Sequence, residues 1–256
     1  MPAKRKQKLA GNHQKCWLWG RHLVTETMIS GRWIPRKLIL SEELSQTELT
    51  QIQTAAERQH VPVELAPPAR LKELCRSGEH QGYVAQMPEF TCLEFSEFLK
   101  KMSAGKIGPL LILDRIQDPQ NLGAMLRSAE VLGASAVIIG AQEQVGVTTA
   151  VARSSAGAIN HIPVVQVSSL LATIRRLHSI GFQIVGTSLA ESVPLSADLF
   201  QSKVAILIGN ESTGVAPELL EACNLRVRIP QSGQLDSLNA AVAAGILLYA
   251  VSLSSK

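Results

Sequence analysis

The chain has 256 residues, of which 46% are hydrophobic and 18% are charged, and its formal net charge is +4. These values are typical of a folded globular protein and exclude an intrinsically disordered chain. We found no run of about 18 apolar residues and no apolar core of a secretory signal, so we expect a cytoplasmic protein with no membrane partner. The four cysteines form no CxxC pair, which argues against a zinc site or a disulfide framework.

Positive charge is concentrated near the N-terminus. Residues 1–40 contain nine Lys or Arg and one acidic residue, so they carry +8 and the other 216 residues sum to −4. Basic residues with interleaved aromatic residues suit an anionic polymer, because phosphates attract cations and bases stack on flat rings. We predict that residues 1–14 are a flexible polyanion-binding arm. The basic residues of this arm are Lys4, Arg5, Lys6 and Lys8. For Trp17, Trp19 and Trp33, the alternative is that they anchor a first helix.

The first part of the chain predicts a small α/β domain in which strands and helices alternate. The predicted strands are residues 37–40, 61–65 and 82–86, and the predicted helices are 46–58, 68–75 and 91–101. The segment 102–109 contains two glycines and a proline and is mostly polar. It predicts a linker, and we place a domain boundary near residue 105.

The second part predicts an open parallel sheet with helices on both faces. Residues 110–113 are a continuous apolar run, as in a strand that is buried on both faces. The other predicted strands are 136–139, 162–166, 183–186, 204–208 and 226–229. The predicted helices are 119–132, 148–155, 169–180, a short one from 217, and 237–251. In such sheets, ligands bind beyond the carboxyl ends of the strands.

Three loops after predicted strands carry unusual polar residues. The first leads into a helix that Asp118 can cap, with Asn121 and Arg127 on it, and the second contains Gly209 and Glu211. The third crosses from an Ile-Pro pair to Asp236 and Ser237, either of which can cap the last helix, with Asn239 in its first turn. Taken one at a time, Arg127 is an ordinary solvated charge, Asn121 a first-turn polar residue and Glu211 a turn acid. Neither GxGxxG nor GxxxxGK[ST] occurs, which argues against a dinucleotide or triphosphate site.

The order and spacing of the three motifs are more specific than any one of them. N-x5-R, then IGNE, then an IP loop that runs into SLN, closely resemble the SpoU branch of the SPOUT RNA methyltransferases, often called TrmH-type. WLWGRHLV (17–24) and HQGYVAQ (80–86) are similar to the start and end of the small substrate-recognition domain in ribosomal RNA members. The resemblance is greatest to the 23S rRNA guanosine-2′-O-methyltransferase group.

This resemblance implies both an architecture and an activity. Residues 15–104 would bind the RNA substrate, and residues 105–256 would form a methyltransferase domain with a deep C-terminal trefoil knot. The activity would be methylation of a ribose 2′-hydroxyl, most similar to that on 23S ribosomal RNA, with S-adenosylmethionine as donor and no metal. Members of the family are typically homodimers through the knot.

The resemblance also implies the site residues. The active-site polar set falls on Asn121, Arg127, Glu211, Ser237 and Asn239. The donor-binding backbone falls on Gly186, Gly209, Ile229 and Leu238. Arg21 joins the N-terminal arm as an RNA-binding residue. A guanidinium holds its proton too tightly to act as a base, so we assign Arg127 to the target phosphate or the developing alkoxide.

Three other functions stay open at this point. The substrate could be transfer RNA, since the preference for ribosomal RNA rests on the folded N-terminal domain alone. The chain could be a non-catalytic RNA-binding protein of the same fold, although all five polar positions are present. A dinucleotide-dependent oxidoreductase is disfavoured by the missing glycine fingerprint.

Overall fold

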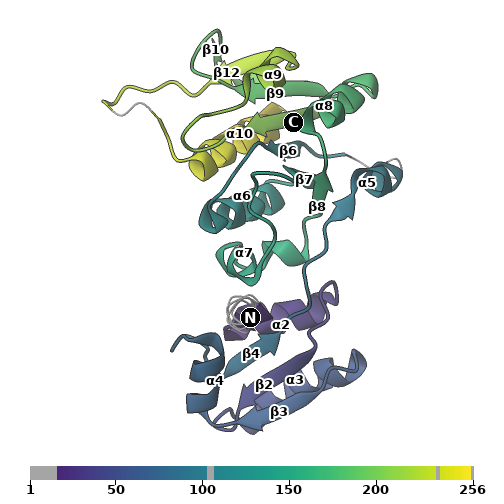
Figure 1. Cartoon of the computed structure of the whole chain (residues 1–256), viewed down its shortest axis with the longest axis vertical. Helices are drawn as coiled ribbons and strands as arrows, with labels where there is room; N and C mark the ends of the chain where they lie inside the picture. Colours follow the sequence, from purple (N-terminus) through teal and green to yellow (C-terminus); the bar gives the residue numbers. More distant parts are fainter. Residues whose placement is uncertain (1–15, 103–106, 235–236, 255–256) are drawn as a thin grey trace, which may run out of the picture. The chain divides into compact units, whose positions relative to one another are not determined.

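A computed structural model describes residues 16–102, 107–234 and 237–254 of the chain. The described chain forms two compact units (Figure 1). The first unit contains the chain up to residue 91 together with residues 147–161, and the second contains residues 92–146 and those from 162 onward. The predicted arm at 1–14 and the predicted boundary near residue 105 lie outside the described residues. None of the helices in the described part has the length and hydropathy needed to span a bilayer.

The first unit is built on a mixed sheet. Its strands are β1 (Trp17–Trp19), β2 (Lys37–Ser41), β3 (Val63–Ala66) and β4 (Tyr83–Gln86). Its helices are α2 (Arg21–Ser30), α3 (Gln46–Arg58), α4 (Pro68–Cys75), α7 (Thr149–Ser154) and the 3₁₀ turn η2 (Ala158–Asn160). The strand order among these is β1-β4-β2-β3, in which β2 and β3 are parallel and the other pairs antiparallel.

Both faces of this sheet are covered. On one face, Trp17, Ile39 and Val84 pack with Leu71 and Cys75 of α4. Successive side chains of β2 point to opposite faces, so Leu38 and Leu40, which are fully buried, belong to the other face. The interior apolar surface is the main source of stability for such a unit, at about 25 cal/mol per Å² removed from water.

The tryptophans are packing residues of the first unit. Trp17 and Trp33 are 4% and 8% exposed, which leaves neither free to stack on a base. Their place differs from the predicted helix: Trp17 and Trp19 lie on β1, and Trp33 follows α2. The prediction missed β1 because a three-residue strand is too short to show alternation.

Residues 147–161 are held in the first unit by side chains of α2 and its neighbours. Trp33 Nε1 donates to the carbonyl of Ile159 at 3.2 Å. Asn160 Nδ2 donates to Thr27 Oγ1 at 3.3 Å, and His161 Nε2 lies 2.7 Å from a carboxylate oxygen of Glu26. The guanidinium of Arg153 stacks 3.7 Å from the ring centroid of Trp19. A segment distant in sequence therefore completes the first unit.

A tight turn brings the chain into β4. Tyr83 N–H donates to the carbonyl of His80, and the two central residues, Gln81 and Gly82, have φ of 52° and 83°. Positive φ at both central positions is what a type I′ turn requires. A Cβ on Gly82 would lie 2.7 Å from Leu44 Cδ2, so the position also lacks room for a side chain.

The second unit contains the remaining elements. Its strands are β5 (Leu93–Glu94), β6 (Leu110–Leu113), β7 (Ala136–Gly140), β8 (Val164–Val167), β9 (Gln183–Thr187), β10 (Val193–Pro194), β11 (Val204–Ile208) and β12 (Leu225–Arg228). Its helices are α5 (Phe95–Met102), α6 (Pro119–Val131), α8 (Leu170–Ser179), the 3₁₀ turn η3 (Ala197–Leu199), α9 (Pro217–Glu221) and α10 (Ala240–Ser254).

The predicted parallel sheet is confirmed. Within the described residues it has eight strands in the order β10-β12-β9-β11-β6-β7-β8-β5, and every pair is parallel. The central strands β6 and β11 are buried along their whole length. Helices α5, α8 and α9 contribute to the apolar cluster on one face, and α6 packs beside α10, which contacts β11 (Figure 1). The trefoil knot stays a prediction.

Two predicted helix starts are wrong, and a short strand was missed. The helix expected at 91–101 starts at Phe95, because Leu93 and Glu94 pair with β8. The two-residue strand β10 was missed for the same reason as β1, its short length. The last helix starts at Ala240 and not at residue 237. By contrast, Asp118 caps α6 as expected, since its side chain accepts from Gln120 N–H at 2.9 Å.

The β4 turn predicts a pH dependence. His80 is 9% exposed, and its Nδ1 accepts the Gly82 N–H at 3.1 Å. Burial, with a smaller contribution from Lys72, lowers the pKa of His80. The unfolded chain therefore binds more protons between the two pKa values, so this contribution to stability is complete above about pH 6.5 and is lost as pH falls through the folded-state pKa.

Replacing His80→Asn removes the titration and keeps an acceptor for the N–H two residues on. We expect the free energy of unfolding to fall more steeply in the parent protein than in this variant as pH drops below about 6.5. Tryptophan fluorescence measures the unfolding of the first unit, because all three tryptophans belong to that unit. The exposed His22→Asn is the control and should follow the parent profile. Parallel profiles for His80→Asn and the parent would contradict the prediction.

Candidate active site

Three loops meet at the carboxyl edge of the large sheet. β6 ends at Leu113, β11 at Ile208 and β12 at Arg228. β6 and β11 are parallel neighbours, with Leu113 opposite Ile208. The loops that follow these strands therefore start at the same edge, which is where open parallel sheets bind ligands.

A chain of hydrogen bonds joins the three loops. Asn239 Nδ2 donates to Asn121 Oδ1 at 2.9 Å, and Asn121 Nδ2 donates to Glu211 Oε1 at 2.8 Å. Asn121 and Glu211 are 90 residues apart in the sequence, and Asn121 and Asn239 are 118 apart. The structure thus brings together three of the five predicted catalytic residues.

The direction of this hydrogen-bond chain is fixed by its ends. An ionised Glu211 can only accept, so Asn121 must turn its amide nitrogen toward it and offers Oδ1 to Asn239. At the other end, Asn239 Oδ1 accepts from Ala241 N–H at 2.9 Å and from Val242 N–H at 3.3 Å. Asn239 therefore caps α10. This corrects the expected cap: Ser237 lies outside the helix and Asp236 outside the described residues.

Arg127 and Ser237 are not part of the hydrogen-bond chain. The side chain of Arg127 is exposed on α6 and has no hydrogen-bond or ion-pair partner in the described chain. Ser237 is exposed on the loop before α10. Both groups are available to an external ligand, and an unpaired guanidinium suits a phosphate in particular.

A pocket of about 500 Å³ opens beside Glu211. Predicted site residues that line it are Gly209, Glu211, Ile229, Ser237 and Leu238. Apolar side chains that line it are Ile208, Val215, Leu220, Val227 and Leu247. Apolar surface next to strand-end backbone and a few polar groups is the usual composition of a small-molecule site. A Cβ on Gly209 would lie 2.1 Å from the Gly214 carbonyl carbon and Val215 nitrogen, so glycine lets these backbones touch.

Gly186 does not line this pocket, and its role as a donor-binding residue stays a prediction. A Cβ at Gly186 would lie 2.7 Å from Cys223 Sγ and 3.0 Å from Leu220 Cδ2. Burial raises the pKa of Cys223 to about 11, so this thiol is protonated at neutral pH. The observed reason for glycine at residue 186 is the close packing of β9 against α9.

An ion pair between the buried Asp114 and the partly exposed Arg115 holds the Glu211 loop. Asp114, which is 3% exposed, accepts from Arg115 Nε at 3.0 Å and from Arg115 Nη2 at 3.1 Å. The Asp114 carboxylate also accepts a hydrogen bond from the Ala216 N–H at 2.8 Å. The hydrogen bond to Asp114 is the main cause that raises the pKa of Arg115. If the buried Asp114 carboxylate lost Arg115 as its partner, the free energy of unfolding would fall by several kcal/mol.

Sequence reasoning missed Asp114, Arg115 and Asn210 as site-building residues. Asn210 Nδ2 donates to the Arg115 carbonyl at 2.7 Å, which ties the second loop to the first. One signal was available, because two opposite charges follow a strand of four apolar residues. A charge at the end of a buried strand needs a partner, and the adjacent residue supplies it.

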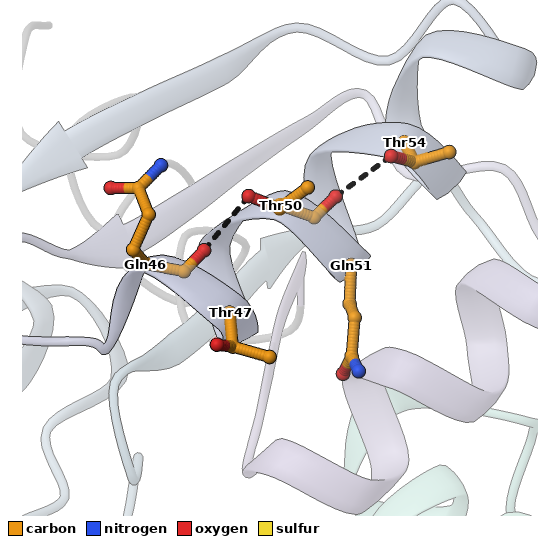
Figure 2. Close-up of a pocket in the computed structure, with 5 residues that line it drawn as sticks. All are labelled: Gln46, Thr47, Thr50, Gln51 and Thr54. Atoms are coloured by element: carbon orange, nitrogen blue, oxygen red, sulfur yellow. Dashed lines mark hydrogen bonds between the residues drawn. The ribbon is translucent and has the colours of Figure 1, made fainter.

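A second depression, on α3 of the first unit, has a different character. Figure 2 shows its lining residues, Gln46, Thr47, Thr50, Gln51 and Thr54. The hydroxyls of Thr50 and Thr54 donate to carbonyls one turn earlier in the same helix, at 2.8 Å each. None of the five lining side chains carries a charge, so this surface lacks a cation that could bind a phosphate strongly.

Of the predicted RNA-binding residues, the structure describes Arg21. Its guanidinium pairs with Glu48 at 2.8 Å and is half exposed. Lys4, Arg5, Lys6 and Lys8 lie outside the described residues. No cluster of three or more potential metal ligands occurs in the residues that the structure describes.

Comparison with known proteins identifies the family. Residues 108–249 match the SpoU rRNA methylase family, and residues 17–91 match the domain described as RNA 2′-O ribose methyltransferase substrate binding. This chain belongs to the SpoU methylase family. A Staphylococcus aureus (strain MSSA476) protein assigned to the TrmH family of tRNA/rRNA methyltransferases is 35% identical over 236 residues, which covers 91% of this chain and 93% of that protein.

Two solved structures of RNA methyltransferases have the same fold. The AdoMet-bound rRNA methyltransferase from Sinorhizobium meliloti is 25% identical with a TM-score of 0.78, over 95% of this chain and 89% of that chain. A structure described as an RNA 2′-O ribose methyltransferase is 27% identical with a TM-score of 0.74, over 97% of this chain and 91% of that chain. The family prediction made from the three motifs is confirmed.

The contact between Gly186 and Cys223 predicts a rescue. We expect Gly186→Ala to lower the free energy of unfolding by about 1–3 kcal/mol, because the new methyl group overlaps Cys223 Sγ. In the double variant with Cys223→Ala, most of this loss should disappear, and urea denaturation measures both. Gly146→Ala is the matched control, since a Cβ there meets nothing within 4 Å. Equal losses with and without Cys223→Ala would show that the contact is not the cause.

Proposed function

We propose that this SpoU methylase transfers a methyl group from S-adenosylmethionine to the 2′-hydroxyl of a ribose in RNA. The proposed RNA is ribosomal, and transfer RNA is the alternative. One observation carries the proposal. Asn239, Asn121 and Glu211 form a hydrogen-bonded set, and Glu211 of this set lines a pocket that also has apolar side chains in its wall. The match of residues 17–91 to a substrate-binding domain of RNA 2′-O ribose methyltransferases supports ribose as the target.

The residues of the pocket fit the proposed donor. Its apolar side chains suit an adenine ring, and the chain at Gly209, Ile229 and Leu238 lies along its wall. When bound, S-adenosylmethionine supplies an activated methyl group on a positively charged sulfur. The protein then has to hold a ribose oxygen in line with that methyl group and assist loss of the hydroxyl proton. Positioning of this kind can supply about 7–11 kcal/mol in favourable cases.

The polar set can orient the ribose. Glu211 Oε1 is occupied by Asn121, whereas Oε2 has no partner among the described residues. A carboxylate oxygen in this state can accept a hydrogen bond from a sugar hydroxyl. Asn121 and Asn239 keep that carboxylate in one orientation, so we assign Glu211 and Asn239 to orientation of the loops and the ribose. Ser237 lies on the pocket wall outside this hydrogen-bonded set, and we assign it to contact with the ribose as well.

Arg127 has a separate role in this proposal. Its guanidinium is exposed and has no partner among the described residues. A guanidinium offers hydrogen-bond donors and no acceptor. It is therefore suited to bind the target phosphate or the developing alkoxide and unsuited to act as base. Capture of the RNA falls to the first unit, the basic residues at 4–8 and Arg21, because attraction to phosphates needs positive charge.

We also propose that the active form is a homodimer through α10. Val242, Tyr249 and Leu253 are 51%, 56% and 45% exposed, although all are large and apolar. Positions i, i+7 and i+11 fall on one side of a helix. An exposed apolar row of this kind is typical of a surface that a second copy covers.

Arg127→Ala tests the assignment of the guanidinium. We expect methyl transfer to fall by about 10²–10³-fold, which is the usual loss when one charged donor is removed from a developing oxyanion. A rise in KM alone would assign Arg127 to phosphate binding, and a fall in kcat would assign it to the alkoxide. The assay uses labelled donor and RNA from cells that lack the gene, with the exposed Arg175→Ala as control.

A second experiment tests the proposed function as a whole. Mapping of 2′-O-methyl sites on total RNA, with and without the protein, should show a new site in ribosomal RNA. A new site in transfer RNA would support the alternative substrate, and a new methyl group on a base would overturn the ribose assignment. A native rate for Arg127→Ala would remove that residue from the mechanism.

The proposed dimer predicts a monomeric variant. We expect Val242→Glu to shift the protein from dimer to monomer in light scattering, because a charge in a buried apolar interface is left unpaired. Ile29→Glu is the control, since Ile29 is also a large exposed apolar residue, at 74%, but lies on α2 of the first unit. A parent protein that is monomeric, or a dimeric Val242→Glu, would contradict the proposed interface.

A further inference from the structure

The loop that carries Glu211 is closed on itself. Asn210 N–H donates to the Gly214 carbonyl at 3.1 Å, and Gly214 N–H donates to the Asn210 carbonyl at 2.9 Å. Inside the loop, Asn210 Oδ1 accepts from Ser212 N–H at 2.9 Å and from Thr213 N–H at 3.2 Å. The loop is therefore a small rigid piece, and the position of Glu211 depends on how this piece is attached to the sheet.

Two residues at the end of β6 attach the loop. Asp114 Oδ2 accepts from the Ala216 N–H, which holds the chain just after the loop. Arg115 Nη2 donates to the Gly214 carbonyl at 3.2 Å, and the Arg115 carbonyl accepts from Asn210 Nδ2 at 2.7 Å. Asp114 and Arg115 therefore contact both ends of the closed loop, at Asn210 and Gly214, and also Ala216 just after it.

The geometry of this attachment is specific to an Asp–Arg pair. The guanidinium contacts both carboxylate oxygens through Nε and Nη2, and Nη2 still reaches the Gly214 carbonyl. A planar fork of donors can do this, and the single ammonium of a lysine cannot. Arg115 also has a φ of 56°, a left-handed conformation that a residue other than glycine rarely adopts. Such a conformation persists when the surrounding contacts over-determine it.

We propose that Asp114 and Arg115 are positioning residues of the active site. Together they set the place of the 209–215 loop, and through it the orientation of the Glu211 carboxylate toward Asn121. Neither residue lines the pocket, whereas Gly209, Asn210, Ser212, Thr213 and Gly214 all do. The pair therefore acts on the donor site through the loop. The catalytic consequence rests on the proposed function, and the attachment of the loop does not.

Hydrogen exchange separates positioning from general stability. The reporters are the amides of Asn210 and Gly214, which close the loop that the pair holds, and of Ala216, which donates to Asp114. The amides of β7, on the other side of β6 from β11, are the reference. In Arg115→Ala the three hydrogen bonds of the guanidinium, two to Asp114 and one to the Gly214 carbonyl, are lost. We therefore expect exchange at the reporters to rise at least about tenfold, with β7 unchanged. Arg115→Lys keeps the charge and loses the fork, so its effect should be intermediate.

Donor binding completes the experiment. Calorimetry with S-adenosylmethionine should show an affinity that falls in the same order as the exchange data, from parent to Arg115→Lys to Arg115→Ala, with Arg175→Ala equal to the parent. Unchanged exchange at the three reporters, or an equal rise in β7, would overturn the proposal. If the reporters respond as expected and the parent protein does not bind the donor, the loop attachment stands and the proposed function fails. Should Arg115→Ala not fold, Arg115→Lys alone decides, because its local exchange must still exceed that of the parent.

Discussion

The pairing of β6 with β11 is the constraint on which the rest of the site depends. The two strands are about 90 residues apart in the chain, yet they run side by side in the middle of the sheet, from Leu110 opposite Ala205 to Leu113 opposite Ile208. Both are wholly apolar and wholly buried, so each removes its side chains from water on both faces. Their shared register places the first polar residues after each strand at the same edge. Asn121 and Glu211 can meet only because of this pairing.

The resulting site combines hydrogen-bonded polar side chains with an apolar pocket wall. Asn239 has two tasks, since its side-chain oxygen caps α10 and its nitrogen binds Asn121. One side chain therefore both caps the last helix and fixes the orientation of the Asn121 amide. An oriented set of dipoles of this kind needs little rearrangement when a reaction begins, and this is the usual origin of electrostatic catalysis.

Charge is divided between the parts of the chain. Residues 1–40 carry +8, whereas the chain from residue 107 holds nine Lys or Arg and ten acidic residues. A near-neutral region attracts RNA weakly at a distance, because steering depends on net charge over the surface. This distribution is consistent with the proposed capture of RNA by the N-terminal part. Residues 147–161 show that the two parts are not separate in sequence, since this segment lies inside the methylase match and folds into the first unit.

The sequence by itself determined the large-scale order of the molecule. Apolar runs of four or five residues, separated by helical periodicity, predicted the parallel sheet, and the order of three motifs predicted the family, because both signals are local in the chain. It did not reveal the two- and three-residue strands β1, β5 and β10, whose pairing partners alone make them strands. Nor did it reveal that Asn239, and not Ser237, caps the last helix.

Only the tertiary structure decided how the site residues meet. Asn121, Glu211 and Asn239 were predicted as members of one set, but their hydrogen bonds span 90 and 118 residues, and no local pattern encodes such contacts. The same holds for Asp114 and Arg115, whose partners Asn210, Gly214 and Ala216 become neighbours only when β11 pairs with β6. The physical reason is that hydrogen bonds are directional and short, so they depend on the final position of the backbone, whereas burial depends on composition and period, which the chain carries locally.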